Sequence, residues 1–223
     1  MMKIFACVFD LDGTILDTLQ DLANSVNYAL NQKGYPQRTV DEVRSFVGNG
    51  IPKLIERAVP EGTAETEIEE TLMIFKEHYA VHLNDNTKPY DGIISLLENL
   101  KSKGISTAVV TNKAHFAAAE LTKQFYSSLI DVTVGQKDGV PTKPDPTALN
   151  EALKTLGVKS ENAVFVGDSD VDVFTAHNGN LKCIGVTWGF RSRENLLSAG
   201  ADFIADSAEE IIRILDNNFV IGQ

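Results

Sequence analysis

The pattern of apolar and polar residues changes twice along the chain. Residues 4–9 form an almost unbroken apolar run, which predicts a strand buried on both faces. From about Asp17 onward, apolar residues recur every three or four positions, a spacing typical of amphipathic helices. Gly34 with Pro36 ends the first helix and Gly48 the second, and two further helices are expected at about 52–58 and 64–83. Residues 16–86 are therefore expected to be helical, with no strand among them.

Each of the longer helices in this stretch has one apolar face. The first presents Leu19, Leu22, Ala23, Val26 and Leu30, and the last, about 64–83, presents Ile68, Leu72, Phe75 and Tyr79. Between them, Thr39 and Glu42 have the spacing of a capping box that opens a short second helix, and a third follows from about Pro52 to Ala58. The stretch is expected to form a small helical domain with its own core.

From residue 91 the pattern becomes an alternation of helices and strands. Helices are expected at 92–102, 114–125, 146–156, 171–178, 192–199 and 208–217, and strands at 105–110, 131–134, 163–166, 182–186 and 203–205. Such alternation predicts a parallel sheet with helices on both faces. The expected fold is an α/β protein with a Rossmann-like, doubly wound core formed by residues 1–15 and 87–223. Residues 16–86 are expected to form a helical cap inserted after the first strand.

Composition and charge narrow the classes of partner. Of the 223 residues, 43% are hydrophobic, as in an ordinary globular protein, and the net charge of −11 disfavours nucleic acid and anionic membranes as partners. No apolar stretch approaches the ~20 residues of a membrane span. The two cysteines, Cys7 and Cys183, lie in apolar runs and are expected to be buried thiols. These features favour a cytoplasmic protein without a membrane partner.

Two aspartates follow the first strand directly. In an open α/β sheet, ligands bind beyond the carboxyl ends of the strands, and Asp10 and Asp12 stand at such an end, before Gly13 and Thr14. Side chains two positions apart on a strand point the same way, about 6.6 Å apart, so both carboxylates can flank one reacting group. One can attack phosphorus while the other handles the proton of the leaving group. A simple turn after the strand is the structural alternative.

Anion-binding groups are expected after later strands. Thr111 and Asn112 close the strand 105–110, where a hydroxyl and the amides of a helix N-terminus would form an anion site; a bare helix cap is the alternative. Lys143 lies among three prolines, which restrict its backbone. Its ammonium group could neutralise a phosphate oxygen or steady a carboxylate nucleophile, although a lone loop lysine is more often a solvated charge.

A second aspartate cluster follows the apolar strand 163–166. Asp168, Asp170 and Asp172 alternate in this loop, and such a cluster favours a hard cation with oxygen ligands. An EF-hand would need glycine at position 173 and glutamate at position 179, where the chain has Val173 and Gly179. A helix-cap cluster is the structural alternative, and Asp170 is the member that it explains most readily.

Other sites of catalysis find little support. His78 and His82 have a spacing compatible with zinc, but the sequence shows no third ligand beside them. The chain lacks a P-loop, a GxGxxG fingerprint and a GxSxG nucleophile elbow. Neither cysteine is followed six residues later by arginine, as in the cysteine phosphatases.

The four groups, in this order, resemble the haloacid dehalogenase superfamily of phosphotransferases. The resemblance covers essentially the whole chain, and within the superfamily the sequence looks like the phosphoglycolate phosphatase-like branch. It is carried by the runs 9–17 (FDLDGTILD), 46–51 (FVGNGI), 110–113 (VTNK) and 185–189 (GVTWG), with the later GDSDVD run at 167–172.

The resemblance implies a role for each site residue. Asp10 would be the nucleophile that forms an aspartyl-phosphate, and Asp12 the general acid and base, which also lends its backbone carbonyl to the metal. Thr111 and Asn112 would hold phosphate while Lys143 neutralises charge around it. Asp168 would ligate Mg²⁺ directly and Asp172 would support it. A carboxylate attacking a dianionic phosphate needs such cations to offset the repulsion.

The resemblance also implies a substrate class. The expected activity is a Mg²⁺-dependent hydrolysis of a small phosphorylated metabolite, with 2-phosphoglycolate as the best single candidate. Gly48 and Asn49, which join two cap helices, would line the entrance, and Lys53 or Arg57 is a candidate for meeting a substrate carboxylate. A phosphomutase of the β-phosphoglucomutase type, a pyrophosphatase or nucleotidase, and a non-catalytic binding protein on the same fold stay open as alternatives. The protein is expected to be a monomer or homodimer.

Overall fold

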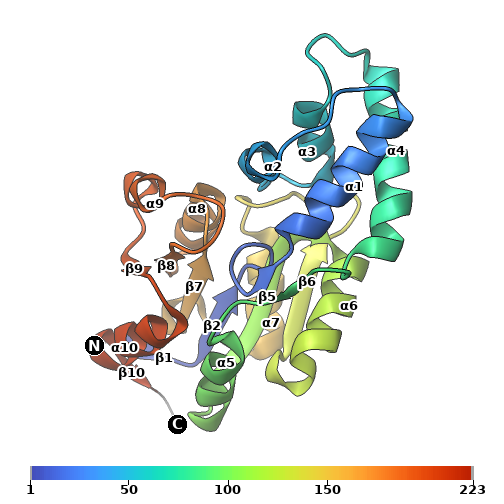
Figure 1. Ribbon diagram of the computed structural model, residues 1–223. Coiled ribbons are helices and arrows are strands. Elements are labelled where there is room, and N and C mark those ends of the chain that lie inside the picture. Colours follow the sequence, from blue (N-terminus) through green and yellow to red (C-terminus); the bar gives the residue numbers. More distant parts are fainter. Residues whose placement is uncertain (1, 222–223) are drawn as a thin grey trace. The chain divides into compact units, whose positions relative to one another are not determined.

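The computed structural model describes residues 2–221 (Figure 1). The chain forms two compact units. The inserted unit consists of Asp17–Lys88, and the split unit consists of the described residues before and after that segment.

A six-stranded sheet forms the middle of the split unit. Its strand order is β6-β5-β2-β7-β8-β9, and every pairing is parallel. The strands are β2 (Ala6–Phe9), β5 (Ser106–Ala114), β6 (Val132–Gln136), β7 (Ala163–Gly167), β8 (Lys182–Val186) and β9 (Phe203–Ala205). The chain adds β5 and β6 on one side of β2 and then returns to the other side with β7, β8 and β9. The strand order therefore reverses beside β2, which is where an open α/β sheet binds its ligand.

Helices cover the sheet on both faces. They are α5 (Ile93–Ser102), α6 (His115–Tyr126), α7 (Thr147–Leu156), α8 (Asp170–Asn178), α9 (Arg193–Ala199) and α10 (Ala208–Asn218), with two 3₁₀ turns, η1 (Ser127–Leu129) and η2 (Ser160–Asn162). Ala6 and Val8 point into a core cluster with Leu149 of α7 and Val173 of α8. The alternate strand residues, such as Phe9, face the other way and are fully buried as well. The expected doubly wound α/β core is confirmed.

The structure adds pairings that the sequence pattern did not indicate. The apolar run 4–9 is divided into β1 (Met2–Ile4) and β2, and β1 pairs in parallel with a last strand, β10 (Phe219–Ile221). Where the chain leaves and re-enters the split unit, β3 (Leu16–Asp17) pairs with β4 (Lys88–Pro89). The expectation that residues 16–86 contain no strand is therefore wrong at their first two residues.

Four helices make up the inserted unit, namely α1 (Leu19–Gln32), α2 (Val40–Phe46), α3 (Ile51–Ala58) and α4 (Glu65–His82). The predicted apolar face of α1 is buried along its whole length. On α4, Phe75 and Tyr79 are buried as expected, whereas Ile68 and Leu72 are half-buried and Thr71 is fully buried. The capping box of Thr39 and Glu42 is present at the start of α2. None of the described helices is long and apolar enough to cross a bilayer.

A buried aspartate ties together the two ends of the inserted unit. Asp21 of α1 is 1% exposed, and its carboxylate accepts hydrogen bonds from the backbone N–H groups and side chains of Asn86 and Thr87 at 2.7–3.0 Å. Both carboxylate oxygens thus have donors, so the burial of this charge is compensated.

Candidate active site

Asp10 and Asp12 leave the sheet at the carboxyl end of β2. The Asp10 N–H donates to the Val166 carbonyl at 2.9 Å, which continues the β2–β7 pairing by one step. Gly13 follows with φ +88°, a conformation that favours glycine. The chain then turns back, and Gly13 N–H donates to the Leu16 carbonyl. Asp10 is 8% exposed, and its side chain lies at the point where the strand order reverses.

Lys143 reaches this point from the loop before α7. Its Nζ atom lies 2.8 Å from Asp10 Oδ1 and 2.7 Å from Asp172 Oδ1, and the side chain is 3% exposed. The structural alternative for this residue, a solvated loop charge, is therefore wrong. Burial by itself lowers the pKa of Lys143, but the charges of Asp10 and Asp172 outweigh it and the net shift is upward. The residue is held as an ammonium group between two carboxylates.

Asp168 directly follows β7, and residues of two neighbouring loops donate hydrogen bonds to its carboxylate. Its Oδ1 accepts from the Thr14 hydroxyl at 3.0 Å, and its Oδ2 accepts from the Phe190 N–H at 2.7 Å. Gly189 packs so closely that an added Cβ would lie 2.3 Å from the Asp168 Cβ and 2.4 Å from the Gly13 carbonyl oxygen. The side chain is held between the turn after β2 and the loop after β8.

The helix cap in the cluster of Asp168, Asp170 and Asp172 is formed by other residues than the sequence indicates. Ser169 is the N-cap of α8, and Asp172 completes a capping box by accepting from the Ser169 N–H at 3.0 Å and hydroxyl at 2.6 Å. Asp170, the expected cap, instead lies in the first turn with its side chain 46% exposed, 3.8 Å from Arg191. Asp172 is fully buried, with one oxygen in the cap and the other on Lys143.

Asp10, Asp168 and Asp172 form a compact carboxylate trio. One oxygen from each lies within 4.8 Å of the others, and among the described residues this is the group of three or more potential ligands close enough to share an ion. Burial raises the pKa of Asp10 to about 6, with Lys143 opposing the shift and Asp172 adding to it. Burial also raises the pKa of Asp168 well above its usual range, with further contributions from Asp172 and Asp10.

The trio fits a hard divalent cation. Asp10 Oδ1 is buried, and among the described residues its one close polar contact is the ion pair with Lys143 at 2.8 Å. One ammonium shared between Asp10 and Asp172 leaves three neighbouring carboxylates with less positive charge than negative charge, which is costly in a buried site. Carboxylate oxygens are the ligands that small hard cations prefer, and added positive charge would offset the repulsion within the trio.

Thr111 and Asn112 lie at the carboxyl end of β5 instead of opening a helix. The strand continues to Ala114 across an irregularity after Val110, and α6 begins only at His115. The expected anion site at a helix N-terminus is therefore wrong, although both residues are buried, on the strand next to β2. The Asn112 amide exchanges hydrogen bonds with the Lys143 backbone, accepting from its N–H at 2.8 Å and donating to its carbonyl at 3.2 Å.

The sequence pattern indicated no role for Lys113. It is 5% exposed, and its Nζ lies 3.0 Å and 3.3 Å from the two carboxylate oxygens of Asp12. Its position directly after Thr111 and Asn112, at the end of a buried strand, was the only available signal. The split unit therefore contains two buried lysines, each paired with a carboxylate of the Asp10–Asp12 turn.

The candidate substrate residues of the cap lie within the inserted unit. Gly48 and Asn49 join α2 to α3, and Arg57 donates to the Asn49 side chain at 2.9 Å and to the Phe46 carbonyl at 2.8 Å. Lys53 pairs with Glu56 on the same helix at 2.6 Å. Both candidate cations thus have partners inside their own unit.

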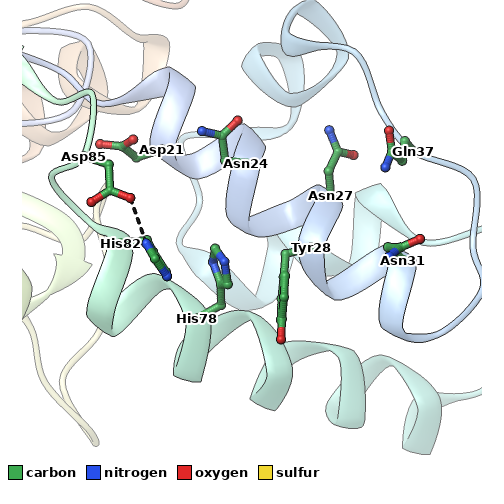
Figure 2. Close-up of a pocket in the computed structure, with 9 residues that line it drawn as sticks. All are labelled: Asp21, Asn24, Asn27, Tyr28, Asn31, Gln37, His78, His82 and Asp85. Carbon is green, nitrogen blue, oxygen red and sulfur yellow. Dashed lines mark hydrogen bonds and ion pairs between the residues drawn. The ribbon is translucent and has the colours of Figure 1, made fainter.

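A polar pocket also lies within the inserted unit, between α1 and α4 (Figure 2). Its volume is about 500 Å³, and its lining consists of Asp21, Asn24, Asn27, Tyr28, Asn31, Gln37, His78, His82 and Asp85. The rings of Tyr28, His78 and His82 stack in a row, and Figure 2 shows their planes side by side. His78 contacts Ser25 through Nδ1 and His82 contacts Asp85, so the histidines have protein partners.

The fold and the carboxylate trio define an α/β enzyme with a charged centre at the carboxyl ends of its parallel strands. Residues 7–186 match the family model of the haloacid dehalogenase-like hydrolases. The chain belongs to this family.

Similar proteins extend the match to nearly the full chain. A phosphoglycolate phosphatase from Vibrio parahaemolyticus is 34% identical over 214 residues, covering 93% of this chain and 94% of the relative. One from Aquifex aeolicus is 32% identical over 218 residues, covering 96% and 97%. The crystal structure of a candidate phosphoglycolate phosphatase from Lactobacillus delbrueckii superposes with a TM-score of 0.91 at 35% identity, covering 100% of both chains.

Proposed function

We propose that this chain is a Mg²⁺-dependent phosphatase that hydrolyses a small phosphate monoester through an aspartyl-phosphate at Asp10, with 2-phosphoglycolate as its substrate. The observation that carries the proposal is the state of Asp10. It is a buried carboxylate at the strand-order reversal, 2.8 Å from a buried lysine, and its Oδ1 receives no hydrogen bond from the described residues. The ammonium beside this carboxylate can offset the negative charge of a phosphate group that approaches it.

The proposed reaction has two half-reactions. Asp10 attacks phosphorus and the bond to the leaving oxygen breaks, while Asp12 gives that oxygen a proton. Asp12 then takes a proton from the water that attacks the aspartyl-phosphate, so the net reaction consumes one water and releases alcohol and phosphate. Lys143 offsets charge on the phosphate and on Asp10 throughout. Thr111 is proposed to bind phosphate directly, and Asn112 both to bind phosphate and to fix the Lys143 backbone.

The residues suited to hold Mg²⁺ are Asp10, Asp168 and the backbone carbonyl of Asp12, with Asp172 in support. When bound, the ion supplies positive charge that shields the nucleophile from the phosphate dianion. Asp172 has both oxygens engaged, by Ser169 and Lys143, which favours an indirect role. The Thr14 and Phe190 donors fix the Asp168 carboxylate, as expected for a ligand that must be oriented in advance.

The choice of substrate rests on the relatives. Those from Vibrio parahaemolyticus and Aquifex aeolicus are phosphoglycolate phosphatases, and the identity to them extends over both units of this chain. The inserted unit is proposed to act as the cap that selects the leaving group, with Gly48 and Asn49 at its substrate-facing loop. Two buried free thiols, Cys7 and Cys183, and a small metabolite as substrate favour a cytoplasmic location.

A substrate panel tests the proposal. With Mg²⁺ present, kcat/KM is compared for 2-phosphoglycolate, pyrophosphate, nucleoside monophosphates and sugar phosphates, and repeated in EDTA. The expected result is Mg²⁺-dependent release of phosphate with 2-phosphoglycolate preferred. Preference for pyrophosphate or nucleotides would replace the substrate while keeping the reaction class. Conversion of a sugar phosphate to its isomer without release of phosphate would identify a phosphomutase, and absence of turnover across the panel would contradict catalysis altogether.

A further inference from the structure

The pairing of Lys113 with Asp12 is an ion pair between segments far apart in the sequence. The two residues are separated by 101 positions, and the ammonium lies within 3.0–3.3 Å of both carboxylate oxygens. Contact with both oxygens restricts rotation of the carboxylate as well as its position. This contact therefore defines how the Asp12 side chain is presented.

The lysine approaches Asp12 from inside the protein. The Lys113 side chain is 2% exposed, whereas the Asp12 side chain keeps 15% exposure. Part of the Asp12 carboxylate thus stays accessible to solvent, while the buried Lys113 ammonium contacts it. A buried ammonium group costs several kcal/mol in desolvation unless it is paired, and Asp12 supplies that partner.

The two buried lysines of the site contact different carboxylates. Lys143 contacts Asp10 and Asp172, and Lys113 contacts Asp12. Each of the two aspartates thus has its own buried ammonium partner. The geometry therefore separates the two aspartates that must perform different tasks in the proposed reaction.

We infer that Lys113 is a positioning residue that orients the Asp12 carboxyl group for proton transfer to and from the leaving-group oxygen. The inference rests on the proposed function, because it assumes that Asp12 is the general acid and base. It extends that function by naming the residue on which Asp12 depends for its alignment.

Comparing kcat for two leaving groups distinguishes this role from a purely structural one, which would affect both substrates equally. An alkyl phosphate such as 2-phosphoglycolate needs a proton on its departing oxygen, whereas p-nitrophenolate leaves p-nitrophenyl phosphate without one. For Lys113→Met, kcat for the alkyl ester is expected to fall about 10²-fold with KM unchanged, while kcat for p-nitrophenyl phosphate falls less than about 10-fold. Lys137→Met, which removes an exposed lysine paired with Glu151, is the matched control and should match wild type on both esters.

A double-mutant cycle completes the test. Adding Lys113→Met to Asp12→Ala should cause no further loss on the alkyl ester, because the group that Lys113 aligns is already gone. If Lys113→Met does not fold, Lys113→Arg decides, because it keeps the charge but its planar head displaces the carboxylate and should give a smaller loss that is still selective for the alkyl ester.

Several results would overturn the inference. These are equal losses on the two esters, additive losses in the cycle, or a raised KM with unchanged kcat, which would make Lys113 a substrate-binding residue. Failure of the proposed function looks different, since wild-type protein would then show no Mg²⁺-dependent turnover of either ester, and the role of Lys113 would be overturned with it.

Discussion

Two buried aspartates, one in each unit, differ in how their charge is compensated. Asp21 of the inserted unit is 1% exposed, and its carboxylate accepts hydrogen bonds from Asn86 and Thr87 on both oxygens. Asp10 of the split unit is 8% exposed, with an Oδ1 that no described group donates to and a pKa raised to about 6 by burial. Hydrogen bonds to both oxygens suit a structural residue, whereas a raised pKa beside other buried carboxylates suits a group kept for a ligand or a reaction.

The largest expected effect comes from Asp10→Asn. A carboxamide is a poor nucleophile, so kcat with Mg²⁺ should fall on the order of 10⁴-fold or more. Because the substitution removes a costly buried charge, the metal-free protein should unfold at the same temperature or a higher one. Phosphate release and thermal unfolding measure the two effects. Activity near that of wild type would place the nucleophile elsewhere.

The same substitution at Asp21 should have the opposite outcome. In Asp21→Asn, an NH₂ group faces donors that need an acceptor, so the protein should lose about 3 kcal/mol of stability. For a chain of this size that corresponds to a fall in Tm of roughly 6–12 °C. The folded protein should keep the wild-type kcat/KM, measured below its transition. An Asp21 variant with normal stability and impaired turnover would contradict the contrast between the two residues.

A smaller effect is expected in the pH dependence of stability, which Mg²⁺ should weaken. Because the pKa of Asp10 is raised to about 6, the folded protein holds a proton there that the unfolded chain has already lost. Stability from this group is present at low pH and lost as the pH rises through about 6. In EDTA, Tm should therefore fall by a few degrees between about pH 5 and pH 7, and Mg²⁺ should raise it most at the higher pH. Asp10→Asn should show a weaker fall, and a metal-free Tm that rises over this range would contradict the shift.

The smallest expected effect distinguishes two similar helix caps. Thr39 with Glu42 and Ser169 with Asp172 both form capping boxes, one in each unit. Thr39→Ala should cost about 1 kcal/mol and leave kcat unchanged. Ser169→Ala should cost a similar amount and also raise the Mg²⁺ concentration needed for half-maximal activity, because Asp172 loses a partner. Equal catalytic behaviour of the two variants would remove Asp172 from the proposed metal site.

Much of the fold was predictable because its signals are local. The alternation of helices and strands after residue 91 and the box at Thr39 depend on residues within a few positions of one another. The short pairings of β1 with β10 and of β3 with β4 were not predictable, because strands of two or three residues carry no periodicity. The extension of β5 to Ala114 was missed for a similar reason, since Thr111–Lys113 is polar and lacks a strand pattern.

In the candidate site, too, local features were predictable and long-range contacts were not. Asp10 and Asp168 were identified by their position after buried apolar strands, which the sequence shows directly. The pairing of Lys113 with Asp12 depends on the order of β2 and β5 in the sheet and on the irregularity in β5. The positions of the charged residues could therefore be predicted from the sequence. Which charges pair with one another could be seen only in the three-dimensional structure.

The parallel pairing of β1 with β10 has a consequence for genetic engineering of this chain. Met2 lies opposite Phe219 and Ile4 opposite Ile221, so a linker between these strands need only run back along one three-residue strand. About four added residues can span that length. A circular permutant opened at Gly62, an exposed position in the turn between α3 and α4, would then encode the split unit as one continuous segment and divide the inserted unit instead.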